Sequence, residues 1–105
     1  MGIDDKMIQK IVERILSVTQ PDKIILFGSA ATDQMTRDSD IDLLLVGEAG
    51  FSEVVKALYP AQEALGREIN PKLYGPSEWQ KARAEGSAFV REVLTKPVIN
   101  VISAP

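Results

Sequence analysis

The sequence predicts an α/β or α+β fold, with a small mixed or antiparallel β-sheet and helices mainly on one of its faces. Two short apolar runs, at residues 23–27 and 41–46, have the length and composition of strands rather than of buried helices. Around them, apolar residues recur at the three- and four-residue spacing of amphipathic helices. A chain of 105 residues with this pattern is expected to form one domain over residues 1–105.

The first helix is expected at residues 4–19. An acidic residue, Asp4 or Asp5, suits its N-terminal end, and Pro21 is expected to end it. The apolar stripe of this helix is expected to face the core, and the alternative is that it binds a partner helix. The stripe consists of Ile3, Met7, Ile8, Ile11, Val12, Ile15 and Leu16.

The middle of the chain predicts a second helix and a third strand. The helix begins near Phe51, is expected to bend at Pro60, which has no backbone N–H, and stops at Gly66. The strand is predicted over residues 67–74. Pro71 within it cannot donate a hydrogen bond to a neighbouring strand, which indicates an edge strand or a bulge.

The C-terminal part predicts two more helices and a last extended segment. Ser77 and Gln80 have the spacing of a capping box at the start of the third helix, which ends near residue 86. Residues 87–95 read as the fourth helix. Residues 98–102 form a final strand or an extended tail, which could pair with another chain if it lies at a sheet edge.

The composition excludes several classes of function. There are no cysteines and no histidines, which rules out disulfides, thiolate zinc sites and histidine-based catalysis, so any metal must be held by oxygen ligands such as those of Mg²⁺ or Mn²⁺. The net charge of −3 argues against general electrostatic attraction to nucleic acid. No apolar run reaches the roughly 20 residues of a membrane span. The acidic N-terminus lacks the features of a signal peptide, so a cytoplasmic location is expected.

Two carboxylates and a glycine-serine turn form the candidate site. Asp40 and Asp42 stand at the start of the second predicted strand, where alternate residues point to the same face. Their Cα atoms would lie roughly 6.5–7 Å apart, close enough to converge on one divalent cation or on a close pair. Gly28 would let a phosphate approach the backbone, and Ser29 is expected to cap a short helix at residues 30–32 that attracts anions. A metal platform beside a phosphate cradle favours phosphoryl or nucleotidyl transfer.

Each of these features also has a plainer interpretation. An Asp-x-Asp pair on a surface strand is commonly solvated charge, and Gly-Ser after a strand is commonly a turn. Arg37 lies in a polar segment just before the acidic pair. It either belongs to a loop without a specific role or reaches a bound triphosphate.

The combined pattern resembles the signature of the minimal nucleotidyltransferases of the DNA polymerase β superfamily. It reads Phe27-Gly28-Ser29, a gap of ten residues, and Asp40-Ile41-Asp42-Leu43, and the resemblance extends over residues 23–103. It implies the nucleotidyltransferase fold and binding of an NTP, most naturally ATP, through Gly28 and Ser29. It also implies Mg²⁺ or Mn²⁺ binding by Asp40 and Asp42, and transfer of a nucleoside monophosphate to an acceptor hydroxyl. Family members of this size often act with a separate helical partner of the HEPN type, sometimes as antitoxins that modify the partner toxin with AMP.

Two positions depart from the family pattern. Ala30 stands where many relatives have an arginine, and Asn70 stands where active members usually have a third carboxylate. Glu68 is expected to share a strand face with Asn70 and could substitute for that carboxylate. The sequence therefore predicts a metal-dependent nucleotidyltransferase with these two side chains completing the site. The alternative is a catalytically inactive module of the same fold that binds a nucleotide or a partner.

Overall fold

The computed structural model describes residues 3–32, 36 and 38–103 of the chain. Over these residues the chain forms four α-helices, one short 3₁₀ helix and four strands. None of the helices in the described ranges is long and apolar enough to cross a membrane. In chain order the elements are α1 (Asp5–Leu16), β1 (Lys23–Phe27), η1 (Gly28–Ala31), β2 (Ile41–Val46), α2 (Phe51–Leu65), β3 (Ile69–Tyr74), α3 (Pro76–Glu85), α4 (Ala88–Thr95) and β4 (Ile99–Ser103).

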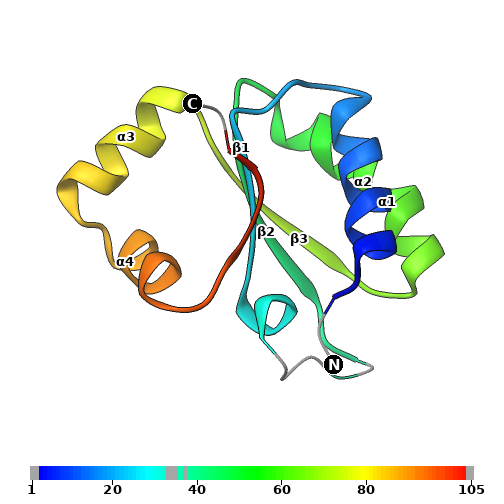
Figure 1. Cartoon of the computed structure of the whole chain (residues 1–105). Coiled ribbons are helices and arrows are strands. Elements are labelled where there is room, and N and C mark those ends of the chain that lie inside the picture. The colour runs from blue at the N-terminus through cyan, green and yellow to red at the C-terminus, as the bar shows by residue number, and fades with distance from the viewer. Residues whose placement is uncertain (1–2, 33–35, 37, 104–105) are drawn as a thin grey trace.

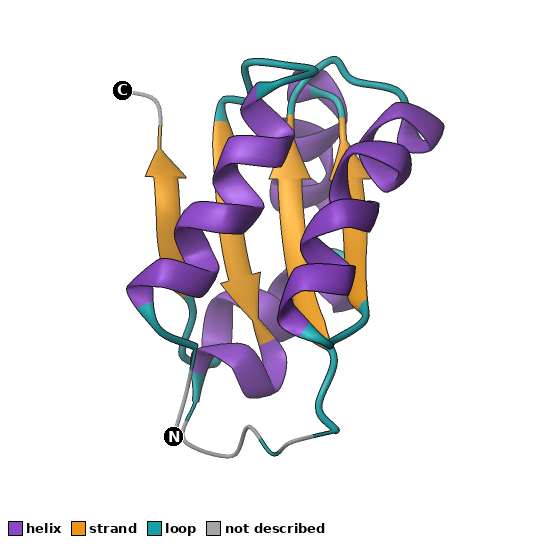
Figure 2. Ribbon diagram, turned by 90° about the vertical axis from the view of Figure 1, so that its right-hand side faces the viewer, coloured by secondary structure: helices purple, strands orange, loops and turns teal. Residues whose placement is uncertain are grey.

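The four strands form one mixed sheet in the order β3-β2-β1-β4, with α1 and α2 in front of it in Figure 2. β1 pairs antiparallel with both β2 and β4, whereas β2 pairs parallel with β3. The parallel pair is joined through α2, the kind of crossover that parallel neighbours need. β3 is an edge strand, as Pro71 indicates, and the final segment is a paired strand rather than a tail.

Helices cover both faces of the sheet, so the prediction that they lie mainly on one face is wrong. Figure 1 shows α1 and α2 on one side and α3 and α4 on the other. Ile24 and Leu26 of β1 belong to the core under α1 and α2, while Ile25 belongs to a second core with Trp79 of α3 and Val90 of α4. β1 and β2 carry apolar side chains on both faces, and a strand of that kind needs a cover on each side.

The helix ends differ from the predictions where local hydrogen bonds decide them. α1 begins after Asp4, whose Oδ1 accepts a hydrogen bond from the Met7 backbone N–H at 2.9 Å. It ends at Leu16, well before Pro21, and the Ser17 hydroxyl donates to the carbonyl of Arg14 at 2.6 Å. The proline therefore lies beyond the helix and does not end it.

α2 continues through Pro60 as one helix and stops at Gly66, as predicted. Pro60 is exposed, and the neighbouring residues Leu58 and Ala61 are buried in the core. Burial of the flanking turns thus outweighs the cost of one missing backbone hydrogen bond, about 3 kcal/mol in a helix interior. Gly66 adopts φ +64°, the left-handed conformation of a helix stop.

The capping box of α3 also lies elsewhere than predicted. The Glu78 carboxylate accepts a hydrogen bond from the Gly75 backbone N–H at 3.0 Å. This is one half of a capping box, because glycine at the N-cap has no side chain to complete it, and it replaces the predicted pair of Ser77 and Gln80. Pro76 explains the shift, because its fixed φ and missing N–H suit the first position of a helix.

Candidate active site

Gly28 and Asp42 meet where β1 ends beside β2. Phe27 and Asp42 are opposite each other in the antiparallel pair, so Gly28 begins its turn next to that carboxylate. Gly28 adopts φ +68°, and a Cβ at this position would lie 2.7 Å from Asp42 Oδ2. Glycine is therefore needed here for the backbone conformation and also for the close approach of the carboxylate.

Asp40, Asp42 and Asn70 gather on the same side of the β2–β3 pair. Asp42 and Asn70 are direct neighbours in the parallel register. The Asn70 amide donates a hydrogen bond to Asp40 Oδ2 at 3.2 Å. The side chains of Asp40 and Asn70 are exposed, and Asp42 is half-buried. Two carboxylates thus share one patch with an amide that orients one of them.

The environment of Asp42 disfavours its charged form. Burial raises the pKa of Asp42 above its ordinary value of 3.8, and the nearby charge of Asp40 raises it further, while a hydrogen bond with Asn70 partly offsets both effects. A cation at this position would remove the conflict between the two carboxylates.

The raised pKa of Asp42 predicts a pH dependence of stability. Between 3.8 and the folded-state pKa, the folded protein binds more protons than the unfolded chain, so the free energy of unfolding falls as pH rises through this range. We expect Asp42→Asn to be more stable than the wild type at neutral pH. The gain should shrink below the ordinary pKa, and thermal melts of both proteins from acidic to neutral pH measure it. A gain that is constant across this range would contradict the assignment.

Glu68 lies just before β3, with an exposed side chain and a carbonyl that accepts a hydrogen bond from the Ile41 N–H at 2.8 Å. Within the described ranges, no three His, Cys, Asp or Glu side chains form a group that could hold a metal ion. Glu68 is therefore not gathered with Asp40 and Asp42 into a three-carboxylate cluster. The β3 side chain beside the two acids is Asn70.

Ser29 lies inside the short helix η1, which starts at Gly28 and has no side-chain cap. The prediction that Ser29 caps a helix at residues 30–32 is thus wrong, because the turn begins one residue after Phe27 and places Ser29 within it. Ala30, which departs from the pattern that the resemblance implies, is buried. Arg37 lies outside the described residues, so its predicted role stays a prediction.

Arg67 is a residue that the sequence did not single out. Its Nη1 donates to the backbone carbonyls of Thr36 at 2.6 Å and Ser39 at 2.9 Å, and so ties the segment before Asp40 to the start of β3. The sequence offers no motif for this contact, because the partners are backbone carbonyls about thirty residues away.

We expect Arg67→Ala to loosen the segment that carries Asp40. Loss of two hydrogen bonds from a charged donor should lower the free energy of unfolding by about 1–2 kcal/mol. Amide hydrogen exchange at residues 38–41 should become faster, whereas Arg83→Ala on the exposed side of α3 should leave it unchanged. Unchanged exchange in Arg67→Ala would show that other contacts hold the segment.

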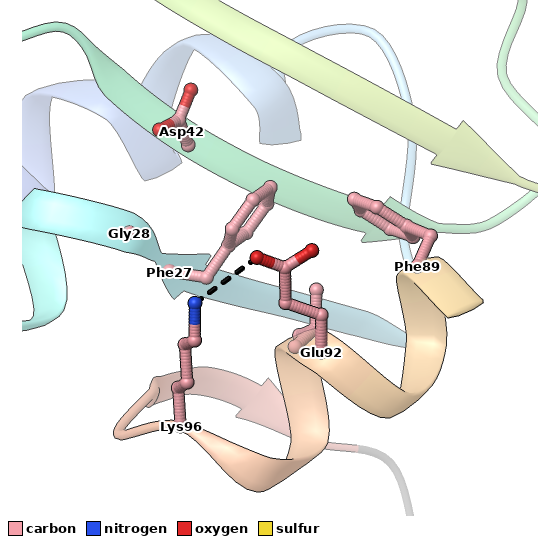
Figure 3. Close-up of a pocket in the computed structure, with 7 residues that line it drawn as sticks. Phe27, Gly28, Asp42, Phe89, Glu92 and Lys96 are labelled. Carbon is pink, nitrogen blue, oxygen red and sulfur yellow. Dashed lines mark hydrogen bonds and ion pairs between the residues drawn. The ribbon is translucent and has the colours of Figure 1, made fainter.

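A hollow of about 230 Å³ opens beside Asp42 and Gly28, and α4 forms its far wall. Figure 3 shows Phe89, Glu92 and Lys96 of this wall facing the two site residues. A second hollow of about 240 Å³ is also lined by Gly28. The first is lined by Phe27, Gly28, Asp42, Phe89, Glu92, Val93 and Lys96, and the second by Gly28, Ser29, Thr32, Lys96 and Pro97.

The donor set fits a hard divalent cation. Asp40, Asp42 and the Asn70 amide oxygen provide oxygen ligands only, and Mg²⁺ is commonly held by one or two carboxylates together with substrate phosphates and water. Two carboxylates without a third are therefore sufficient for an ion that arrives with a polyphosphate. The negative charges of the half-buried Asp42 and the exposed Asp40 are what such an ion would neutralise.

Comparison with known protein families matches residues 6–99 to the nucleotidyltransferase domain, which is most of the chain. The chain belongs to this family. Nucleotidyltransferase domains generally use an NTP and divalent metal ions, in agreement with the donor set described above. The fold class and the resemblance predicted from the sequence are confirmed by this match and by the mixed sheet.

One curated relative of the domain is "Putative protein adenylyltransferase MJ0604" from Methanocaldococcus jannaschii, which is 54% identical over 33 residues. The match covers 31% of this chain and 33% of the relative, so the two proteins are aligned over about a third of their lengths.

Proposed function

We propose that this nucleotidyltransferase domain moves a nucleoside monophosphate from an NTP to an acceptor hydroxyl, with Mg²⁺ or Mn²⁺ held by Asp40 and Asp42. The observation that carries the proposal is the contact between the Gly28 turn and the Asp42 carboxylate at the edge of a hollow. In the proposal, the phosphates lie at the Gly28 turn, next to a cation at Asp42. Nucleotidyl transfer needs both within one site.

In the proposed reaction, the acceptor oxygen attacks the α-phosphorus of the NTP and the bond to the β-phosphate oxygen breaks. Pyrophosphate leaves, and the hydroxyl proton is released to solvent. A bound divalent cation supplies charge neutralisation at the phosphates and at the attacking and leaving oxygens. Asn70 orients Asp40 by its hydrogen bond, and the Gly28 and Ser29 turn leaves the backbone open to the β- and γ-phosphates.

The apolar wall of the hollow beside Asp42 suits the nucleoside. Phe27 and Phe89 meet edge to face, with ring centroids 5.7 Å apart, and Val93 completes this wall. In the proposal, the exposed side chain of Glu68, just before β3, lies near the acceptor hydroxyl. Arg37 stays a candidate contact for the triphosphate. These assignments describe binding and orientation and add no covalent step.

The acceptor is proposed to be a hydroxyl of a partner protein and the donor to be ATP. The name of the relative from Methanocaldococcus jannaschii, a protein adenylyltransferase, supports this choice. The resemblance to minimal nucleotidyltransferases adds a HEPN-type helical protein as the partner, in a toxin–antitoxin pair. Such a reaction would take place in the cytoplasm, where ATP is available.

A second candidate function is nucleotide or partner binding without transfer. It is favoured by Asn70, a neutral residue at the place of the third carboxylate, and by the lack of a three-carboxylate group within the described ranges. Asparagine can orient a ligand but is a poor general base.

Two labelled donors separate these functions. The protein is incubated with a co-purified partner, Mg²⁺ or Mn²⁺, and ATP labelled at either the α- or the γ-phosphate. Nucleotidyl transfer predicts stable protein labelling from the α-labelled donor only. Labelling from the γ-labelled donor would instead indicate phosphoryl transfer, and ATP binding without any labelling would support the binding module.

A further inference from the structure

We infer that Lys96 binds the triphosphate of the nucleotide, and that Glu92 holds the Lys96 ammonium group while no nucleotide is bound. The inference rests on the proposed NTP site and names a residue of that site. Lys96 directly follows α4 and lines both hollows that adjoin Gly28. A group between the two hollows can reach a chain of phosphates that passes over the Gly28 turn.

Most of the described residues around the two hollows are acidic or uncharged. Asp40, Asp42 and Glu92 are acidic, and Ala30 is a buried apolar residue. Among the described residues that line the two hollows, Lys96 is the one with a positively charged side chain.

Two nearby cations have other contacts. The Lys72 ammonium group lies over the Phe89 ring, 5.2 Å from its centroid, and lines neither hollow. Arg67 donates to the backbone carbonyls of the segment before Asp40. Lys96 is therefore the side chain best placed to meet phosphate charge at Gly28.

Glu92 gives Lys96 a temporary partner. Lys96 Nζ lies 3.0 Å from Glu92 Oε1 one helical turn earlier, and the two side chains are 67% and 64% exposed. An exposed pair of this kind contributes little to stability, so little is lost when it opens. Figure 3 shows the pair at the edge of the hollow, on the same side as Phe27 and Gly28. A triphosphate carries more negative charge than one carboxylate and would displace Glu92 from the ammonium group.

The experiment is calorimetric titration of Mg²⁺·ATP and of AMP into the full chain and its variants. Lys96→Ala should weaken Mg²⁺·ATP binding about tenfold, and Lys96→Arg should restore most of it. Glu92→Gln should strengthen binding severalfold because it removes the competing carboxylate, and the double variant should behave like Lys96→Ala alone. AMP binding should change little, because AMP lacks the β- and γ-phosphates. Lys81→Ala, an exposed lysine of α3, is the matched control.

The outcomes are distinct. If the pair only stabilises α4, Lys96→Ala and Glu92→Gln will lower the melting temperature alike and leave Mg²⁺·ATP binding unchanged, which would overturn the inference. Weaker binding in Glu92→Gln would show that Glu92 contacts the nucleotide and would overturn its role as a competitor. Failure of the wild type to bind Mg²⁺·ATP would overturn the proposed function and this inference together. If the wild type binds Mg²⁺·ATP and Lys96→Ala binds it equally well, the inference alone is overturned.

Discussion

Asp42→Asn is expected to reduce nucleotidyl transfer at least about 100-fold. Residues that only support metal ligands already cost 10- to 100-fold when they are replaced, and Asp42 is proposed to be a ligand itself. Asparagine keeps the size of the side chain but removes the charge that the cation needs. The measurement is the rate of labelling from ATP labelled at the α-phosphate.

Stability separates this loss of activity from misfolding. Because burial and Asp40 disfavour the charged form of Asp42, Asp42→Asn should melt no lower than the wild type at neutral pH. Asp38→Asn, which changes an exposed carboxylate close by in the sequence, is the control and should keep its activity. Undiminished transfer by Asp42→Asn would remove Asp42 from the metal site.

Gly28→Ala should destabilise the fold and also abolish Mg²⁺·ATP binding. Alanine in the left-handed conformation costs about 1–2 kcal/mol, which corresponds to a melting temperature lower by roughly 4–8 °C per kcal/mol in a domain of this size. In addition, the new Cβ would lie 2.7 Å from Asp42 Oδ2, so the carboxylate must move away from the site.

Gly66→Ala is a matched control for this variant. Gly66 has nearly the same φ, +64° compared with +68°, and nothing lies within 4 Å of the position of its Cβ. Both variants should lose similar stability from backbone strain, and only Gly28→Ala should lose binding. Equal binding by the two variants would contradict the coupling between the Gly28 turn and Asp42.

The strands and the core of the site could be predicted because their signals are local. The bounds of β1 and β2 match the two apolar runs at residues 23–27 and 41–46. Gly28, Asp40 and Asp42 follow from strand alternation and from a turn that needs glycine. The structure then brings these predicted residues together through strand pairing.

The errors arose where tertiary packing outweighs local preference. Pro60 is accommodated because the buried residues around it hold α2 in place. Helices on both sheet faces could have been predicted from the continuous apolar pattern of β2, since a strand exposed on one face would alternate with polar residues.

The contribution of α4 to the site had no comparable signal. Phe89, Glu92 and Lys96 reach Gly28 only because α4 packs on the sheet face that carries Ile25 and Leu44. In the sequence, Glu92 and Lys96 look like an ordinary exposed pair one helical turn apart. They reach the site because α4 packs on the sheet, although α4 lies about fifty residues after Asp42 in the sequence.

Titration with Mn²⁺ in the presence of ATP tests the shared site most directly. Mn²⁺ broadens NMR signals of nearby nuclei, so the backbone amide signals show where the ion binds. We expect substoichiometric Mn²⁺ to broaden the signals of Gly28, Asp42 and Asn70 first. The signal of Glu48, beyond the opposite end of β2, should be the least affected of these. Selective broadening that reaches Asp42 but spares Gly28, or uniform broadening across the chain, would contradict a single site for the cation and the triphosphate.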